Sequence, residues 1–527
     1  MIKNLHEGTF MKFFRKKVPL ALFSSLLMVL AFPSHDIYPL LWIGFIPLLM
    51  AMEDTTVRES YWLGLITGWA GICGAYPWLS HVTKIYMEAP VPANYLIWIL
   101  YGFYHGQLFG LAAALFTWAR KKTALPVIVI FPIIMTGLWT IFPALFFFNL
   151  GNGTTGFITA LQGIDITGIY GLDYIIVLCS AFIYSIIRHK KLKTPGIILA
   201  GAAIILMVWF SYGIYALHTW REALTPGETK KIGIVQPNRP SSLFILPPEE
   251  GYSTTYPLEM ALSKALIGDR PDLIIWPEGN FYGYFEDISV RLAFMKQVRD
   301  WGIPLLFHDY PWDLGATGKL YRNSSVLIRD DGSYGGRYDK RFIVPFGEYI
   351  PFVNYDWSII QSLELPPPLT PGKGPVTFHA GGMKIDPLIC YETQFSAFVA
   401  DSLGKDPQGK IITVQSNDGW YGRGSEAAQQ NSSIILRAVE NRVPVIHVVN
   451  NGPSMAAGPD GRVLFSYGFW ERGSWIASIP YNEKSGGSFY TRHPALFTTL
   501  MRIFFIVLIA WVIFRNRITA PRSPGRS

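Results

Sequence analysis

The chain has 527 residues, of which 50% are hydrophobic and only 16% are charged. Soluble globular proteins carry about 25% charged residues, so this composition excludes a chain built only of soluble domains and indicates a large membrane-embedded part. The formal net charge of +8 would suit a nucleic-acid partner only if the basic residues gathered on a soluble surface. The three cysteines, Cys73, Cys179 and Cys390, are too few for a disulfide framework.

Long apolar runs fill the first 217 residues. A helix that crosses a bilayer needs roughly 20 mostly apolar residues. We interpret seven runs as such helices, at about 17–34, 38–53, 60–81, 93–119, 125–148, 166–187 and 195–217. An eighth follows at about 497–514. The sequence therefore predicts a polytopic α-helical membrane protein with about eight transmembrane helices.

Clusters of Lys and Arg at the ends of these runs predict the topology. They lie at 12–17, 120–122, 188–193 and 515–526, and seven spans before residue 218 with one after residue 496 put all four on one side. The positive-inside rule assigns that side to the cytoplasm. We expect a multi-pass protein of the inner (cytoplasmic) membrane, with both termini cytoplasmic. The basic residues then mark topology, and no nucleic-acid partner is predicted.

This topology divides the chain into three parts. Residues 1–217 form an N-terminal membrane domain, 218–496 a soluble domain on the periplasmic or outer side, and 497–527 a C-terminal helix with a basic cytoplasmic tail. In the soluble domain, short apolar strands are expected at 231–236, 272–276, 303–307, 383–390, 410–416 and 443–449, and helices at 257–267, 286–301 and 425–441. Fully apolar strands between helices indicate an α/β domain whose sheet is covered on its faces.

Several polar residues follow directly after the expected strands. Glu278 comes after "DLIIWP", Cys390 closes "KIDPLIC", and Asn417 follows "IITVQS". In open α/β sheets, sites gather beyond the carboxyl ends of strands, so these side chains are candidates for one site. Lys340 and Glu348 lie in "YDKRFIVPFGEYIP", a loop rich in Pro, Gly and charge.

Cys390 is the only cysteine outside the apolar runs, and two interpretations stay open from the residues alone. A buried, inert cysteine is common. A nucleophilic thiol needs a base or a lowered pKa; His308 and His447 stand at strand ends, which favours core or supporting positions. A carboxylate base such as Glu278, with Lys340 to stabilise an oxyanion, is the other available solution. No His or Cys pair has metal-ligand spacing, so no metal site is predicted.

Five segments then resemble, in order and spacing, the nitrilase (carbon–nitrogen hydrolase) superfamily: "WPEGN", "YDKRFIVPFGEYIP", "ICYET", "SNDGWYG" and "RAVENRVPVIHVVNNGPS". Joined to a polytopic N-terminal region and one C-terminal span, they resemble the apolipoprotein N-acyltransferases within that superfamily. The resemblance covers essentially the whole chain. It implies that the soluble domain is a nitrilase-like αββα sandwich inserted into the membrane protein.

The resemblance assigns catalytic roles to four residues. It makes Glu278 the general base, Lys340 the residue that stabilises the oxyanion, and Cys390 the nucleophile. Glu348, in "FGEY", corresponds to an additional essential carboxylate. No metal and no organic cofactor is implied.

Four further residues are implied to contact the substrates or the surroundings of the nucleophile. Tyr391 and Glu392 directly follow the nucleophile, and Asn417 and Trp420, in "SNDGW", are expected to line the site near the acyl chain or the acceptor. Two features depart from the family pattern. The stretch 221–275 contains no Trp, although family members often place one early in this domain to help hold the substrate, and Phe244 or Tyr252 is expected to serve instead. Gly279 stands where the family commonly has a small hydroxyl residue, which puts the local hydrogen bonding in question.

In the family, a phospholipid, typically phosphatidylethanolamine, donates an acyl chain to the cysteine. The thioester then passes it to the α-amine of S-diacylglyceryl-cysteine at the N-terminus of an apolipoprotein, in a two-step ping-pong scheme. The implied partners are thus a phospholipid, a diacylated apolipoprotein and membrane lipids, and an apolar arm at 351–370 is expected to cover the site and to move as lipids enter.

Three alternatives stay open from the sequence. A membrane-anchored nitrilase-like amidase or hydrolase would use the same triad with water as acceptor. A non-enzymatic transporter or scaffold would carry a degenerate domain, which the intact Glu–Lys–Cys set disfavours. A related glycan- or polyprenol-linked acyltransferase would share both the triad and the membrane layout. The membrane layout favours acyl transfer over hydrolysis.

Overall fold

The computed structural model describes residues 2–86, 89–224, 227–242, 246–279, 281–315, 318–351 and 367–519. The chain divides into two compact units. One comprises Met1–Pro77, Tyr95–Ile214 and Ala495–Ser527, and the other comprises Trp78–Asn94 and Tyr215–Pro494. Most of the arm expected at 351–370, residues 352–366, lies outside the described residues, as does Phe244.

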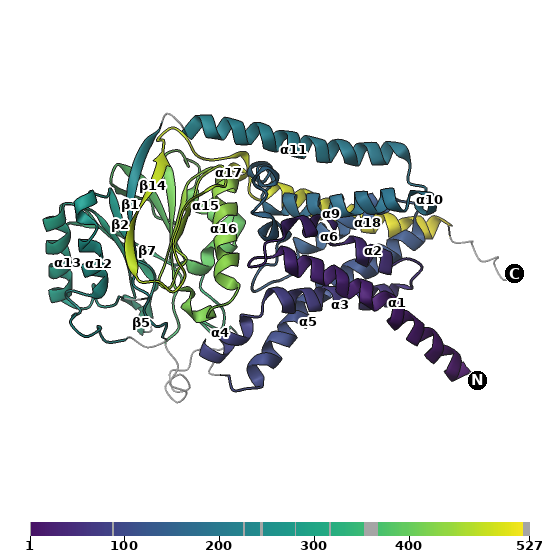
Figure 1. The fold of residues 1–527 in the computed structure, drawn as a ribbon, viewed down its shortest axis with the longest axis horizontal. Coiled ribbons are helices and arrows are strands. Elements are labelled where there is room, and N and C mark those ends of the chain that lie inside the picture. Colours follow the sequence, from purple (N-terminus) through teal and green to yellow (C-terminus); the bar gives the residue numbers. More distant parts are fainter. Residues whose placement is uncertain are drawn as a thin grey trace. The chain divides into compact units, whose positions relative to one another are not determined.

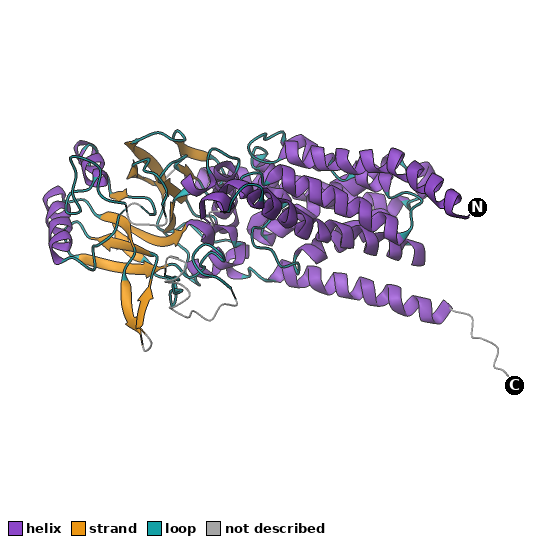
Figure 2. Ribbon diagram, turned by 90° about the horizontal axis from the view of Figure 1, so that it is seen from below, coloured by secondary structure: helices purple, strands orange, loops and turns teal. Residues whose placement is uncertain are grey.

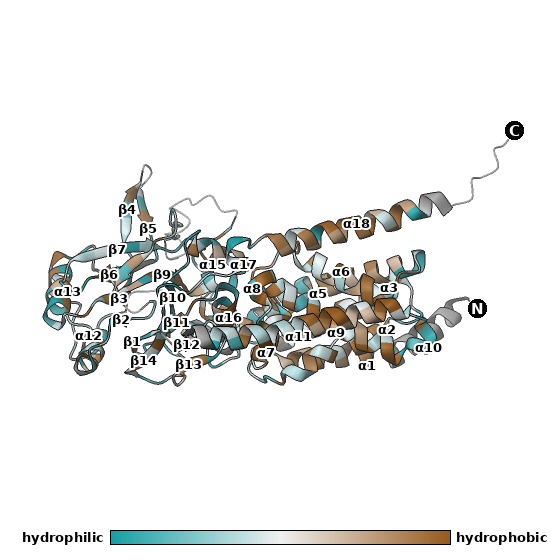
Figure 3. Cartoon of the chain, turned by 90° about the horizontal axis from the view of Figure 1, so that it is seen from above, coloured by the Kyte–Doolittle hydropathy of each residue, from teal (hydrophilic) through white to brown (hydrophobic). Residues whose placement is uncertain are grey.

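The first unit is helical, and hydrophobic residues run along its helices (Figures 2 and 3). The longer helices are α1 (Ile2–Ala31), α3 (Val57–Ala75), α5 (Ala93–Lys122), α6 (Val127–Trp139), α9 (Ile169–Ile187), α11 (Gly196–Leu224) and α18 (Leu496–Thr519). The shorter ones are η1 (Tyr38–Ile43), α2 (Ile46–Ala51), η2 (Leu150–Thr154), α7 (Ile158–Leu161), α8 (Ile164–Thr167) and α10 (His189–Leu192). Each predicted apolar run thus contains helix.

Among the described residues, four helices are long and apolar enough to cross a membrane: Ala93–Lys122, Ile169–Ile187, Gly196–Arg221 and Leu496–Arg515. Three other apolar stretches, Lys17–Ala31, Tyr38–Ala51 and Val127–Trp139, are shorter. These helices indicate a membrane protein, while the number of eight spans stays a prediction. The second and fifth runs differ most from the expectation. Prolines and glycines divide the second run, 38–53, into the two short helices η1 and α2. The helix in the fifth run, α6, ends at Trp139, well before residue 148.

The second unit contains two six-stranded sheets and a small hairpin, drawn as orange strands in Figure 2. The first sheet has the order β14-β1-β2-β3-β6-β7, and its β1, β2 and β3 are parallel. Its strands are β1 (Glu228–Gln236), β2 (Leu273–Ile275), β3 (Leu305–Asp309), β6 (Ser324–Ile328), β7 (Tyr334–Asp339) and β14 (Gly473–Tyr481).

The second sheet has the order β13-β12-β11-β10-β9-β8, and its β9, β10 and β11 are parallel. Its strands are β8 (Phe378–Ala380), β9 (Met383–Ile389), β10 (Lys410–Ser416), β11 (Val445–Val449), β12 (Met455–Ala457) and β13 (Val463–Ser466). The hairpin is β4 (Trp312–Gly315) with β5 (Gly318–Tyr321).

Alternating side chains divide the core of this unit into three layers. Ile234 of β1 and Ile389 of β9 belong to one buried cluster, which draws residues from both sheets and therefore lies between them. Val235 of β1 instead packs with α12 (Leu258–Lys264) and α13 (Ile288–Trp301), and Leu388 of β9 packs with α15 (Ser396–Leu403) and α16 (Glu426–Asn441). The order is helix, sheet, sheet, helix, as Figure 1 shows for this unit, which agrees with the expected αββα sandwich.

One helix of this unit lies in a part of the chain that the sequence assigned to the membrane. We expected a span over 60–81, but α3 ends at Ala75 and a separate helix, α4 (Leu79–Tyr86), begins four residues later. Trp78, directly before α4, donates through its indole Nε1 to Gln429 Oε1 of α16 over 3.1 Å. Its ring also meets the ring of Tyr421 at 5.1 Å. The segment Trp78–Asn94 thus belongs to the α/β unit.

Candidate active site

The candidate site residues stand where strands of the two sheets end. Glu278 lies three residues after β2, Cys390 begins the 3₁₀ turn η4 (Cys390–Gln394) directly after β9, and Asn417 follows β10 directly. Lys340 follows β7 directly. Parallel strands direct their carboxyl ends to one edge, which explains how residues more than 100 positions apart share a site.

Cys390 sits at a strand-to-helix corner with an unusual backbone. Its φ is +48°, in the left-handed region where a residue with a Cβ costs of order 1–3 kcal/mol. The side chain is only 7% exposed. Burial, followed by the charge of Glu278, raises the pKa of the Cys390 thiol well above its usual range, and Lys340 only partly opposes this. The resting thiol is therefore protonated and needs a base to become a nucleophile.

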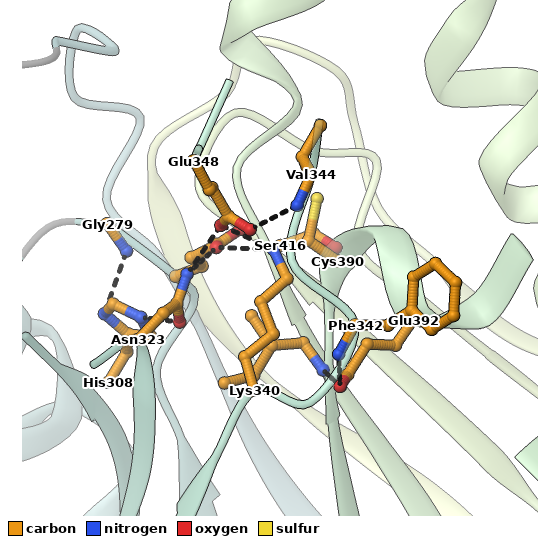
Figure 4. Close-up of polar contacts among 12 residues, drawn as sticks. Gly279, His308, Asn323, Lys340, Phe342, Val344, Glu348, Cys390, Glu392 and Ser416 are labelled. Carbon is orange, nitrogen blue, oxygen red and sulfur yellow. Dashed lines mark hydrogen bonds and ion pairs between the residues drawn. The ribbon is translucent and has the colours of Figure 1, made fainter. Parts of the chain in front are cut away.

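Lys340 is a buried cation between two carboxylates (Figure 4). Its Nζ lies 2.7 Å from Glu348 Oε1 and 3.8 Å from Glu278 Oε1, and its side chain is 1% exposed. Burial alone lowers the pKa of Lys340, but the charges of Glu348, Glu278 and Cys390 outweigh it and raise that pKa. Lys340 therefore stays charged at neutral pH and can act as a fixed positive charge, not as a base.

Asn323, which the sequence analysis missed, joins the two carboxylates. Its Nδ2 donates to Glu278 Oε1 over 2.8 Å and to Glu348 Oε1 over 3.1 Å. Its backbone carbonyl accepts from the Lys340 N–H over 2.8 Å. Glu348 is held further by the Val344 N–H, 2.7 Å from its Oε2. One asparagine thus sets the distance between the predicted base and the carboxylate that holds Lys340.

The strand register explains the position of Asn323 and contains a signal that sequence reasoning could have used. β6 and β7 form a hairpin in which Ser324 pairs with Asp339. The residue before β6 then lies opposite the residue after β7, which places Asn323 beside Lys340. Counting outward from the turn at "DDGS" (330–333) gives the same pairing to within the β-bulge near Ile328.

Glu392 lies beneath the site and does not face an open surface. It is completely buried, and its two oxygens accept from the N–H groups of Ile389, Arg341 and Phe342 and from the Tyr338 hydroxyl, over 2.7–3.1 Å. These donors come from the residues on both sides of Lys340 and from the strand before Cys390. Glu392 therefore fastens the two segments together.

Tyr391 belongs to an aromatic cluster next to the nucleophile. Its ring lies 5.0 Å from Phe395 and 6.1 Å from Phe342, and the Phe342 and Phe395 rings are 3.7 Å apart. Phe398 extends the cluster from α15, 5.8 Å from Phe342. Phe342 is 38% exposed, so the cluster presents an apolar face beside Cys390.

Asn417 faces the loop that carries Glu278. Its Oδ1 accepts from the Ser241 hydroxyl over 2.7 Å and from Asn450 Nδ2 over 3.2 Å. A Cβ at Gly279 would stand 2.8 Å from Asn417 Nδ2, so glycine is required for this close approach. Trp420, in the turn η5 (Asp418–Tyr421), is half-buried.

Two further carboxyls are buried near Cys390: Asp418, which follows Asn417 at the end of β10 and was given no role from the sequence, and Glu426, which was not predicted. Asp418 and Glu426 are 1% and 6% exposed, and Asp418 Oδ1 and Glu426 Oε2 have no hydrogen-bond partner among the described residues. Burial raises the pKa of each well above its usual range, and the Glu278 charge adds to the shift of the Asp418 pKa. The protonated form of both carboxyls is therefore favoured, while Glu278 and Glu348 are the carboxyls that lie next to Lys340.

Within the described ranges, no group of three or more His, Cys, Asp or Glu side chains is arranged to hold a metal ion. The groups gathered at the site are a thiol, buried carboxyl groups and a fixed cation.

Two family models match the chain, and together they span most of it. The model of the apolipoprotein N-acyltransferase N-terminal domain matches residues 24–182, and that of carbon–nitrogen hydrolase matches residues 253–483. A solved amidase of the nitrilase superfamily from Nesterenkonia AN1 is 18% identical at a TM-score of 0.36 and covers 49% of this chain and 93% of its own.

Relatives named apolipoprotein N-acyltransferase align over nearly the full length. The protein from Geobacter metallireducens is 26% identical, with 92% of each chain covered. The one from Chlorobaculum tepidum is 25% identical over 94% of this chain and 96% of its own, and the one from Rickettsia prowazekii 29% identical over 78% and 77%. With both family models in their expected order, the chain belongs to the apolipoprotein N-acyltransferase family.

Proposed function

We propose that this chain transfers an acyl chain from a phospholipid, through a thioester on Cys390, to the N-terminal α-amine of S-diacylglyceryl-cysteine in apolipoproteins. The observation that carries the proposal is the buried Lys340, held between Glu278 and Glu348 beside a protonated thiol. Helices long and apolar enough to cross a membrane belong to the same chain, which suits two lipid substrates.

In the first half-reaction Glu278 acts as general base. It takes the proton from Cys390 Sγ as the sulfur attacks the ester carbonyl of the phospholipid. Lys340 stabilises the negative charge that develops on the carbonyl oxygen, a contribution of several kcal/mol in a water-poor site. The C–O bond breaks, the lysophospholipid oxygen takes the proton from Glu278, and the acyl group stays on sulfur.

In the second half-reaction the α-amine of the acceptor attacks the thioester carbonyl. Glu278 removes a proton from the nitrogen as the C–N bond forms, and Lys340 again stabilises the oxyanion. The C–S bond breaks, and Cys390 recovers its proton from Glu278. Glu348 does not exchange protons in either step; its role is to hold Lys340 charged and in place.

Substrate contacts follow from the surroundings of the nucleophile. The aromatic cluster of Phe342, Tyr391 and Phe395 offers an apolar face for the acyl chain. Asn417 and Trp420 follow β10, the neighbour of β9 in the second sheet, and border the same site in this proposal. Glu392, implied by the resemblance to serve the substrate, is better suited to a positioning role, because its oxygens are occupied by donors from the flanking segments.

The proposal includes a place for the reaction. The donor, with phosphatidylethanolamine as the typical headgroup, and the diacylated acceptor both reside in a bilayer. We place the protein in the inner membrane as a multi-pass protein, with the catalytic unit on the periplasmic side and both termini cytoplasmic, because the basic clusters at 12–17, 120–122, 188–193 and 515–526 then share the cytoplasmic side.

Intact mass spectrometry of the purified full chain with phosphatidylethanolamine tests the thioester. We expect one acyl adduct that hydroxylamine removes. Cys390→Ala should abolish it, whereas Cys179→Ala, which removes a cysteine of the first unit, should keep it. An adduct that survives in Cys390→Ala, or a Cys390→Ala variant that still acylates a diacylated lipopeptide, would contradict the mechanism.

A further inference from the structure

His308 lies behind the catalytic carboxylates, at the end of β3. Its side chain is buried, 1% exposed. Its Nε2 is 2.6 Å from Asn323 Oδ1, and its Nδ1 is 3.3 Å from the Gly279 N–H (Figure 4). The imidazole therefore touches both the amide that joins the two carboxylates and the loop that carries Glu278.

These contacts fix which ring nitrogen carries hydrogen. Asn323 Nδ2 donates to Glu278 and Glu348, so the Asn323 oxygen must face His308. An amide oxygen only accepts and a backbone N–H only donates. Nε2 is therefore protonated and Nδ1 is not, and the ring is neutral. Burial lowers the pKa of His308 to about 4, against the opposing effect of the Asn323 hydrogen bond, which agrees with a neutral ring.

The tautomer has a consequence for Asn323. A primary amide can flip, which would exchange its oxygen and nitrogen. The flipped amide would set Oδ1 against two carboxylates and present an N–H group to a ring N–H. Because His308 Nε2–H points at the Asn323 amide, only the observed amide orientation gives this N–H an acceptor. In the same orientation Asn323 Nδ2 donates to both Glu278 and Glu348.

We propose that His308 is a positioning residue for acyl transfer: as the Nε2–H tautomer it orients the Asn323 amide, which in turn holds Glu278 and Glu348 around Lys340. This inference rests on the proposed function, because it assigns His308 to the same reaction. His308 touches no reacting atom. It acts by fixing the separation between the base and the carboxylate that holds the cation.

The charged and titratable groups around His308 come from several elements. Lys340 follows β7, Glu348 lies in the loop beyond it, and both act on His308 electrostatically. Glu278 is joined to it through Asn323, and the Tyr310 ring lies 4.6 Å away. A second proton on the ring would place a donor against the Gly279 N–H and a cation beside Lys340, so only the neutral ring suits the arrangement.

Three substitutions separate the two ring contacts. His308→Gln places an amide nitrogen near the Nε2 position and keeps the donor to Asn323. His308→Asn places its oxygen near the Nδ1 position and keeps only the acceptor for Gly279. His308→Phe removes both. We expect His308→Gln to keep the single-turnover rate of Cys390 acylation within about 5-fold, and the other two to lose roughly 10- to 100-fold, the effect of one or two lost buried hydrogen bonds.

Matched measurements distinguish positioning from general support of the fold. His447, a completely buried histidine at β11 whose Nδ1 lies 2.9 Å from Asn431, serves as control. His447→Phe should lower the thermal midpoint of the full chain without slowing acylation more than about 3-fold, the size of a lost weak contact. In the slowed His308 variants the KM for phosphatidylethanolamine should stay constant while the rate constant falls, because the acyl chain is bound elsewhere.

A spectroscopic readout tests the tautomer independently of turnover. Selective ¹⁵N-histidine labelling of the full chain, with the His308 signals assigned by their loss in His308→Gln, should show a protonated Nε2 and a bare Nδ1. A protonated Nδ1, or a His308→Phe variant that acylates as fast as wild type, would overturn the inference. If wild type forms no thioester but the ¹⁵N signals show a protonated Nε2 and a bare Nδ1, the proposed function is wrong while the hydrogen-bond geometry around His308 is confirmed.

Discussion

At residue 279, directly after the proposed base Glu278, the absence of a Cβ atom affects the local structure. The family pattern, with a small hydroxyl residue at this position, put the local hydrogen bonding at Gly279 in question. The structure gives a different account, because Gly279 has a φ of +86° and approaches Asn417 closely. Glycine is suited to both conditions at once, and Asn417 receives its hydrogen bonds from Ser241 and Asn450 instead.

Gly279→Ala should therefore impair catalysis beyond its effect on stability. The added Cβ would meet Asn417 Nδ2 at 2.8 Å and displace the loop that carries Glu278. We expect a rate loss of about 10-fold or more, as for small misplacements of catalytic groups. Gly251→Ala is the matched control: its φ of +87° imposes the same strain, with nothing within 4 Å of its Cβ. Equal acylation rates for the two variants would refute this account.

Glu259 gives the clearest dependence of stability on pH. It is completely buried in α12, and neither carboxyl oxygen has a hydrogen-bond partner among the described residues. Burial raises the pKa of Glu259 from 4.5 to about 7. A group whose pKa is raised on folding stabilises the folded state below its unfolded pKa and loses that contribution as pH rises through the folded pKa.

Glu259→Gln should thus have the same thermal midpoint as wild type near pH 4.5 and a higher one at pH 8. In wild type the cost of ionising the buried Glu259 carboxyl grows between pH 4.5 and about pH 7 and then stays constant. This cost is at most about 3 kcal/mol in the free energy of unfolding. Glu250→Gln changes an exposed neighbour and should show no such difference. A Glu259→Gln variant with the same advantage at both pH values would show that charge is not the cause.

At the residue scale the sequence predicted what lies at strand ends. Glu278, Cys390 and Asn417 could be named because an apolar run that stops at a polar residue marks a sheet edge. The roles of Asn323 and His308 do not follow from such runs. Asn323 is identified through the register of the β6–β7 hairpin, and His308, expected only in a core or supporting position, is identified through its contact with Asn323. Such contacts depend on strand order and register, which no single run of residues contains.

At the scale of elements, the agreement is best where the hydrophobic pattern is strong. All six strands expected in the soluble domain and its three expected helices are confirmed, most with bounds within two or three residues. The strands that were missed include the edge strands β13 and β14, where polar residues dilute the pattern, and the buried strands β6 and β12. β6 begins with Ser324 and Ser325, and β12 is only three residues long, so neither forms a clear apolar run.

The helix α4 is the element with the most consequence for the site. Trp78 packs on Tyr421, in the turn that also contains Trp420, and donates to Gln429. Hydropathy could not predict that α4 belongs to the α/β unit, because the residues before α4 have the composition expected at the end of a membrane span. The contact suggests that a segment from between two helices of the first unit supports the loop after β10.

Trp78→Ala should loosen that loop, because it removes a ring that is 4% exposed and a hydrogen bond. We expect a loss of roughly 3–5 kcal/mol in the stability of the α/β unit, and faster amide hydrogen exchange at 417–422. Trp78→Phe keeps a ring against Tyr421 and loses only the hydrogen bond, so its effect should be smaller, about 1 kcal/mol. If both variants exchange like wild type at 417–422, α4 does not support the loop.

At the scale of the whole molecule, hydropathy and structure answer different questions. The apolar runs establish that the first unit suits a membrane, and four helices meet the length and composition needed to cross one. Hydropathy does not tell a straight span from two short helices, as at 38–53, where η1 and α2 replace the expected single helix. The orientation of the unit therefore still rests on the basic clusters.

The central claim concerns the fate of the acyl group. The proposed triad of Glu278, Lys340 and Cys390 would serve hydrolysis and transfer equally well, because both pass through the same thioester. What distinguishes them is the acceptor. A transferase must protect its thioester from water until an amine arrives, and a chain with helices suited to a bilayer has lipid substrates at hand.

The most direct test follows the acyl group from Cys390 in a single turnover. The full chain, loaded with a labelled acyl chain from phosphatidylethanolamine and freed of donor, is mixed with a diacylated lipopeptide, with the same peptide acetylated at its α-amine, or with buffer. We predict that the thioester persists in buffer and with the acetylated peptide, and that the label appears on the free α-amine as an amide. Loss of label to free fatty acid at the same rate in all three would contradict acyl transfer and identify a hydrolase.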